Sequence, residues 1–248
     1  MITVNIKSNL DAALRTFIFS TKKQVEYATR KAVVRTAEDV KKATVAEMST
    51  VFDRPTKYTL RSVYYRLIRS DPPTARVWLK DDRGKGGGAA ANYLMPHIEG
   101  GIRPQKRMEY ALTANGYLPE GWVTVPGAAA KIDQYGNMSV GQIRAILSAL
   151  GAAELTSGYS SNRTATSAKR RRRQLAKYFA IVPGRGGHLH PGVYQKVGQD
   201  IKPLLMFVQA ARYRKRFSLQ TVADRTIARV AGAHFKTAFA EARARGIK

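Results

Sequence analysis

The stretch VFDRPTKYTLRSVYYRLIRS, residues 51–70, changes the spacing of its apolar residues at Pro55 and so separates two kinds of structure. Upstream of Pro55, apolar residues recur three or four positions apart, which is typical of one stripe along an amphipathic helix. Neither Gly nor Pro interrupts this upstream segment, and Ser8 precedes it as an N-cap. The sequence therefore predicts one long helix over residues 8–52.

Downstream of Pro55 the apolar spacing becomes two, which is typical of strands. YTLRSVYYRLIRS, residues 58–70, mixes β-branched, aromatic and basic residues, and TARVWLKD, residues 74–81, alternates again after a DPP turn. Two alternating segments joined by a short turn predict an antiparallel hairpin. The following RGKGGGAAA, residues 83–91, predicts a flexible loop.

The rest of the chain contains shorter elements around a Gly- and Pro-rich middle segment, residues 92–163. Two short helices are predicted within it, KRMEYALTAN at 106–115 and SVGQIRAILSAL at 139–150. The other predicted elements are strands at 2–6, 176–184, 192–198 and 201–209, and a helix from the N-cap Ser218 to about Arg245.

Together these elements predict an α+β fold. We expect the long N-terminal helix and the C-terminal helix to pack on one antiparallel sheet. Residues 1–91 and 164–248 are predicted to form the core domain. Residues 92–163 are predicted to form a loop-rich insertion with short helices.

The composition indicates a folded chain with an anionic partner. Hydrophobic residues make up 44% of the 248 residues, which is enough to bury a core. Lys and Arg total 43 against 17 acidic residues, and the net charge of +26 favours polyanions. The absence of cysteine excludes disulfides and thiolate metal sites. The N-terminus lacks the pattern of a signal peptide, and PLLMFV at 203–208 is too short to span a bilayer.

Patterns for catalysis or metal binding are weak in this sequence. His188 and His190 in HLH could form half of a metal site, or an ordinary Gly-rich hairpin loop. His97 and Glu99 could form an acid–base pair, although a polar loop is the better interpretation, and His234 fits a packed histidine. We therefore expect no enzyme, no bound metal and no cofactor.

Two basic tracts are the strongest functional signal. Arginine planes and interleaved aromatic rings suit nucleic-acid backbones, and they equally suit carboxylates of an acidic protein. A solvated charged face is the third alternative. The first tract is Lys169, Arg170, Arg171, Arg172 and Arg173, and the second contains Arg212, Arg214, Lys215 and Arg216.

Several segments resemble proteins of one viral class. FDRPTKYTLRSVYYRL (52–67), followed by ARVWLKD (75–81), resembles a segment of the tail-completion and neck proteins of tailed bacteriophages. In these proteins a long N-terminal helix leads to a strand through an Asp-Arg-Pro-Thr turn. Three further segments resemble phage structural proteins of this type, in the same order along the chain: YLMPHIEGGIRPQKRMEYAL (93–112), LPEGWVTVPGAAAKIDQYGNMSVGQI (118–143) and PLLMFVQAARYRKRF (203–217).

The resemblance implies a minor virion component, made in the host cytoplasm, at the head–tail junction or capping the tail. It implies rings of six or twelve copies. The implied partners are other copies of the chain, portal, adaptor or tail-tube proteins, and packaged double-stranded DNA, without a membrane. A free basic nucleic-acid-binding protein is the alternative.

These expectations assign roles to particular residues. Lys169 to Arg173 are expected to contact DNA or an acidic ring, and the second tract to pair with carboxylates of a neighbouring subunit. Val33 and Val40 are expected at the subunit interface, because the apolar stripe of the long helix exceeds what one small sheet can cover.

Overall fold

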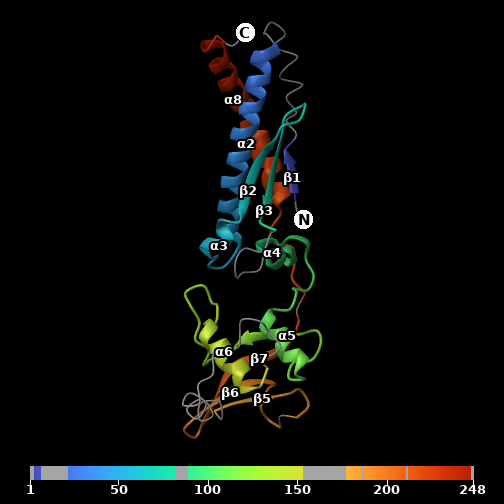
Figure 1. The fold of residues 1–248 in the computed structure, drawn as a ribbon, viewed down its shortest axis with the longest axis vertical. Coiled ribbons are helices and arrows are strands. Elements are labelled where there is room, and N and C mark those ends of the chain that lie inside the picture. Colours follow the sequence, from blue (N-terminus) through green and yellow to red (C-terminus); the bar gives the residue numbers. More distant parts are fainter. Residues whose placement is uncertain are drawn as a thin grey trace. The chain divides into compact units, whose positions relative to one another are not determined.

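The structure, a computed structural model, places the described residues in two compact units (Figure 1). Unit 1 consists of Met1–Gly101 and Tyr213–Lys248, and unit 2 consists of Ile102–Arg212. Each unit has its own sheet and its own core. The described residues are 3–6, 22–81, 89–152, 177–185, 187–210 and 212–246.

Unit 1 combines a three-stranded antiparallel sheet with two long helices. The strand order is β1-β3-β2, so β2 and β1 are the edge strands. The elements are β1 (Thr3–Ile6), α2 (Lys22–Val51), α3 (Lys57–Leu60), β2 (Val63–Ile68), β3 (Thr74–Leu79), α4 (Ala90–Glu99) and α8 (Leu219–Ala244).

The helix α2 buries one stripe of small and apolar residues, as its sequence period predicts. The buried positions recur at helical spacing, so they form a single face. Its buried Thr44 donates its hydroxyl hydrogen to the carbonyl of Val40 at 2.7 Å, which satisfies this polar group inside the core. The stripe is Ala28, Thr29, Ala32, Val33, Thr36, Ala37, Val40, Thr44 and Met48.

The helices α2 and α8 run antiparallel and side by side (Figure 1). Side-chain pairs along their length fix the register, because residue numbers rise on one helix while they fall on the other. These pairs are Glu47 with Arg225 at 3.0 Å, Asp39 with His234 at 2.8 Å, and Glu241 with Arg35 at 2.7 Å.

The sheet of unit 1 packs one face against these helices. On β3, burial alternates strictly, so every second side chain faces the core. The core formed by the sheet and helices includes Val40 and Met48 of α2, Val63 of β2, Val77 and Leu79 of β3, Leu94 of α4 and Phe217, Leu219 and Val222 from the chain's last segment.

Unit 2 contains a four-stranded antiparallel sheet of order β4-β7-β6-β5. Its core includes Leu112, Ile146, Leu147, Val193, Leu204, Leu205 and Phe207. The elements are α5 (Arg107–Ala114), β4 (Trp122–Pro126), α6 (Val140–Ala149), β5 (Tyr178–Ile181), β6 (Gly192–Val197) and β7 (Asp200–Gln209).

A glycine permits close approach of two strands in this sheet. A Cβ added at Gly192 would collide with the backbone oxygen of Leu205 on β7. The register between β6 and β7 also shifts next to this point, between Val193 and Tyr194. Gly192 is therefore required by the close approach of β6 to β7 rather than by a turn.

The α+β fold class and the two long terminal helices are confirmed, but the expected single sheet is wrong. The strands at 178–209 belong with the middle segment, because its strand β4 pairs with β7. The units consequently divide at residues 101 and 212, rather than enclosing an insertion at 92–163. Residues 90–99 form the helix α4, where the sequence predicted the end of a loop and the start of the insertion. Of the predicted helix at 8–52, the part before Lys22 lies outside the described residues.

None of the described helices combines the length and the apolar character that crossing a bilayer requires.

Candidate interaction surfaces

The Asp-Arg-Pro-Thr turn ends α2 and starts the path to the hairpin. Arg54 adopts a left-handed backbone conformation with φ of 45°, which turns the chain sharply after the helix. Thr56 then caps α3 by accepting a hydrogen bond from the N–H of Thr59 at 3.1 Å. The ring of Phe52, just before the turn, lies 5.9 Å from the ring of Phe217. The turn is thus tied to the segment that precedes α8.

The second basic tract is held by its backbone, which leaves its charged side chains at the surface. The N–H groups of Arg216 and Phe217 both donate to the carbonyl of His97, at 2.8 and 3.1 Å. Tyr213 exchanges two backbone hydrogen bonds with Gly101. The four cations Arg212, Arg214, Lys215 and Arg216 are all exposed, and none forms an ion pair with a carboxylate of the described segments.

The other predicted contact residues have different outcomes. The tract Lys169, Arg170, Arg171, Arg172 and Arg173 lies outside the described residues. Val33 and Val40 are buried inside unit 1, with exposed fractions of 1% and 0%. Their side chains pack against the chain's own core, which leaves them no surface for a neighbouring subunit. The expectation that they contact another subunit is therefore wrong.

The sequence interpretation missed a basic groove on the outer face of the unit 1 sheet. Three arginines and Trp78 surround an open groove of about 750 Å³. Arg66 and Arg76 come from two adjacent strands, and the alternation of β2 and β3 turns their side chains away from the core. Arg69 is the residue after β2. The available signal was the pair Arg66 and Arg69, three positions apart, together with the alternation of TARVW at 74–78. The lining residues are Arg66, Leu67, Ile68, Arg69, Arg76 and Trp78.

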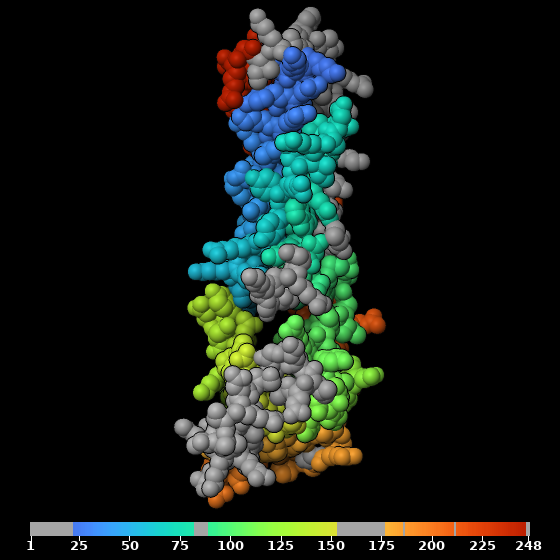
Figure 2. Space-filling view, in the orientation of Figure 1, coloured from blue at the N-terminus to red at the C-terminus, as the bar shows by residue number. Residues whose placement is uncertain are grey.

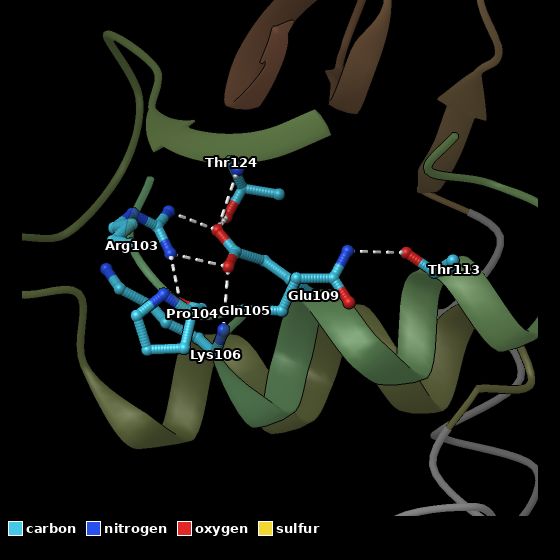
Figure 3. A network of polar contacts seen from close by, with 7 residues as sticks. All are labelled: Arg103, Pro104, Gln105, Lys106, Glu109, Thr113 and Thr124. Atoms are coloured by element: carbon cyan, nitrogen blue, oxygen red, sulfur yellow. Dashed lines mark hydrogen bonds and ion pairs between the residues drawn. The ribbon is translucent and has the colours of Figure 1, made fainter. Parts of the chain in front are cut away.

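The most buried charged group among the described residues is the carboxylate of Glu109 in unit 2 (Figure 3). Its Oε1 accepts hydrogen bonds from Arg103 at 2.5 Å and from the N–H and hydroxyl of Thr124 at 2.8 and 3.0 Å. Its Oε2 accepts from Arg103 at 2.7 Å and from the N–H of Lys106 at 2.7 Å. Glu109 stands three residues after the N-cap Lys106, so this last bond also caps α5.

The surroundings of Glu109 make it a structural group rather than a general base. Burial by itself would raise the pKa of Glu109. Hydrogen bonds from Arg103 and from the backbone N–H groups of Lys106 and Thr124 outweigh burial and hold the pKa below its ordinary value. A general base at neutral pH needs a pKa near 7 and a free lone pair, and five hydrogen bonds already occupy this carboxylate. Its role is to join α5 to β4.

The histidines occupy four separate environments. His234 lies between the long helices, bound to Asp39, in a position close to the packed histidine that the sequence predicted. His188 and His190 are exposed, and no group of three or more metal-ligating side chains occurs within the described segments. His97 lies edge-on to the rings of Phe52 and Tyr213. Burial, with the nearby charge of Arg216, lowers the pKa of His97 and keeps it neutral at pH 7.

Two cationic surfaces of the described chain are candidates for function, the second basic tract and the groove beside Trp78. No family model, curated protein or solved structure matches this chain.

Proposed function

We propose that this chain is a structural component of a tailed-bacteriophage virion, located at the head–tail junction as a ring of identical subunits. The observation that carries the proposal is the order of elements in unit 1. The long helix α2 ends at the Asp-Arg-Pro-Thr turn of residues 53–56, the β2–β3 hairpin follows, and α8 closes the unit. The resemblance to tail-completion and neck proteins implies the first part of this order, a long helix that leads to a strand through an Asp-Arg-Pro-Thr turn.

The distribution of charge supports an assembly role. Three carboxylates on α2 and α8 are engaged inside the chain, since Glu47, Asp39 and Glu241 each pair with a cation or histidine of the other helix. Exposed cations of residues 212–216 have no such partner within the described segments. A net charge of +26, with these three carboxylates already paired inside the chain, favours an acidic neighbouring ring or packaged DNA.

Mass spectrometry of intact tailed particles tests the location. Particles purified from the host strain that carries the gene should contain the chain in amounts far below those of the major capsid and tube proteins. Absence of the chain from intact particles, with its presence in the infected-cell lysate, would overturn the proposal.

Mass photometry of the purified chain tests the ring. We propose six or twelve copies, so particles of six or twelve chain masses are expected, either alone or after addition of the adjoining portal-side or tail protein. A chain that stays monomeric under both conditions contradicts a ring. This measurement does not depend on the purification of virus.

A free nucleic-acid-binding protein is the second candidate, and the observation that favours it is the net charge of +26. Such a protein would bind duplex DNA without sequence preference, and its affinity would fall steeply with salt. It would be found in the lysate bound to DNA rather than in particles. The same lysate and particle samples therefore separate the two functions.

A further inference from the structure

The outer face of β2 and β3 carries arginine and aromatic side chains next to one another. Cross-strand partners on this face are Tyr64 with Trp78 and Arg66 with Arg76. Tyr64 and Ile68 keep 42% and 41% of their surface exposed, although both are large and apolar. Figure 2 shows this hairpin, coloured cyan to teal, at the surface beside the blue α2.

Two positive charges face each other on this side of the sheet, which lowers its stability. Arg66 stands directly opposite Arg76 in the β2–β3 pairing, and like charges in that position destabilise a sheet. The guanidinium of Arg76 lies 5.4 Å from the centre of the Trp78 ring, and that ring lies 6.0 Å from the Tyr64 ring. Arg66 and the neighbouring Arg69 are exposed and form no ion pair with any described carboxylate. An anion placed in the groove would relieve this repulsion.

The composition of the face favours a protein partner over a nucleic acid. Trp, Tyr and Arg are the residues that dominate the energetics of protein interfaces. A sugar–phosphate backbone would pair with the arginines but offers few apolar groups to the exposed Ile68 and Tyr64. β2 is also an edge strand of the described sheet, so an extended segment can lie along it.

The charge also decides which kind of protein fits. A second copy of β2 would bring further arginines to the same edge, which opposes pairing between identical strands. An acidic segment has the complementary charge, and arginine binds carboxylates through two parallel hydrogen bonds. In an extended segment, side chains at alternate positions point to the same face, so carboxylates at every second residue would meet this groove.

We infer that the outer face of β2 and β3 is a docking surface for an extended, acidic segment of a partner protein, whose carboxylates meet Arg66, Arg69 and Arg76. The partner segment would also make apolar contacts with the exposed side chains of Tyr64 and Ile68. The test of this surface needs only the purified chain, so its result does not depend on where the protein is located in a particle.

Trp78 provides a local reporter for the experiment. The chain has two tryptophans, Trp78 in this face and Trp122 in unit 2, so W122F leaves Trp78 as the only one. The probe is a short synthetic peptide of alternating Glu and Thr, titrated at physiological salt, where charges more than about 8 Å away are screened. A peptide with Gln in place of Glu is the matched ligand control.

The expected result is a saturable change in Trp78 emission with the Glu peptide and none with the Gln peptide. R66Q with R69Q should weaken binding about tenfold or more, because two charge-assisted hydrogen-bonded contacts are lost. R30Q with R229Q removes the same charge from exposed helix positions of unit 1 and should change the affinity less than about twofold. Circular dichroism checks that both double variants remain folded.

Three results would overturn the inference. Equal weakening by the two double variants would mean that only the general positive charge attracts the peptide. A Trp78 response to single-stranded or duplex DNA at lower concentration than to the peptide, abolished by R66Q with R69Q, would make the face a nucleic-acid surface. An unchanged Trp78 emission at saturating peptide would mean that nothing docks there. None of these results bears on whether the chain occurs in virus particles.

Discussion

The guanidinium of Arg103 donates to both carboxylate oxygens of Glu109, at 2.5 and 2.7 Å, and Glu109 has no exposed surface. Arg103 itself is only 17% exposed, so the pair is largely shielded from water. Two backbone N–H groups, of Lys106 and Thr124, depend on the same carboxylate. One side chain thus accepts hydrogen bonds from a backbone N–H group at the start of α5 and from another in β4.

Replacing Glu109 by Gln should destabilise unit 2 strongly. The variant keeps the shape but removes the carboxylate charge that Arg103 pairs with, and its amide N–H₂ would face existing donors. Removing one member of a buried ion pair costs about 3–5 kcal/mol. Denaturant unfolding of W78F, followed by Trp122 emission, measures this loss within unit 2. The exposed Glu120 offers a matched control, and E120Q should change stability by less than about 0.5 kcal/mol.

Acid should weaken unit 2 through the same carboxylate. The folded state holds the pKa of Glu109 below its ordinary value of 4.5. Its contribution is therefore complete above that value and is lost as pH falls through the lower, folded pKa. We expect the unfolding midpoint reported by Trp122 to drop as pH is lowered below about 4.5. E109Q should show a smaller drop over the same range, and an equal drop in both proteins would assign the acid sensitivity to other groups.

The two long helices and the hairpin of unit 1 could be predicted because their signals are local. The change of apolar spacing at Pro55 separates α2 from the hairpin, and Ser218 marks the start of α8 by accepting a hydrogen bond from Thr221. The strand β4 could not be predicted in the same way. It is five residues long, and its partner β7 lies about eighty residues further along the chain. Its absence from the prediction is why one sheet was expected rather than two.

The candidate functional residues differ in the same way, since some have a local sequence signal and others depend on the pairing of distant elements. A cluster of adjacent cations is visible in any sequence, so the second basic tract could be found. The groove beside Trp78 depends on the register that places Arg66 opposite Arg76, and register is a property of strand pairing. The buried Glu109 had a local signal, an acidic residue three positions after a helix start, but its partner Thr124 comes from another element.

Thr36 is a position where the chain is expected to gain stability. Its side chain on α2 is 2% exposed, and its hydroxyl has no hydrogen-bond partner among the described residues. Valine has nearly the same shape without the polar atom, so T36V should raise the free energy of unfolding by about 1 kcal/mol. Thr44 is the control, because its hydroxyl already donates to the carbonyl of Val40. A gain from T44V equal to that from T36V would show that the free hydroxyl is not the cause.

A substitution at Val40 tests whether this residue belongs to the core of one chain or to an interface between subunits. It lies in the core of unit 1 with no exposed surface, so V40D buries an unpaired carboxylate. We expect a loss of about 3 kcal/mol or more in unit 1, measured by Trp78 emission in a W122F background during denaturant unfolding. A46D, an exposed site on the same helix, makes the same kind of change and should cost less than about 1 kcal/mol. Because the loss arises within one chain, it should not depend on protein concentration. If V40D unfolded like the parent chain when dilute and differed only in assembly at high concentration, Val40 would belong to a subunit interface after all.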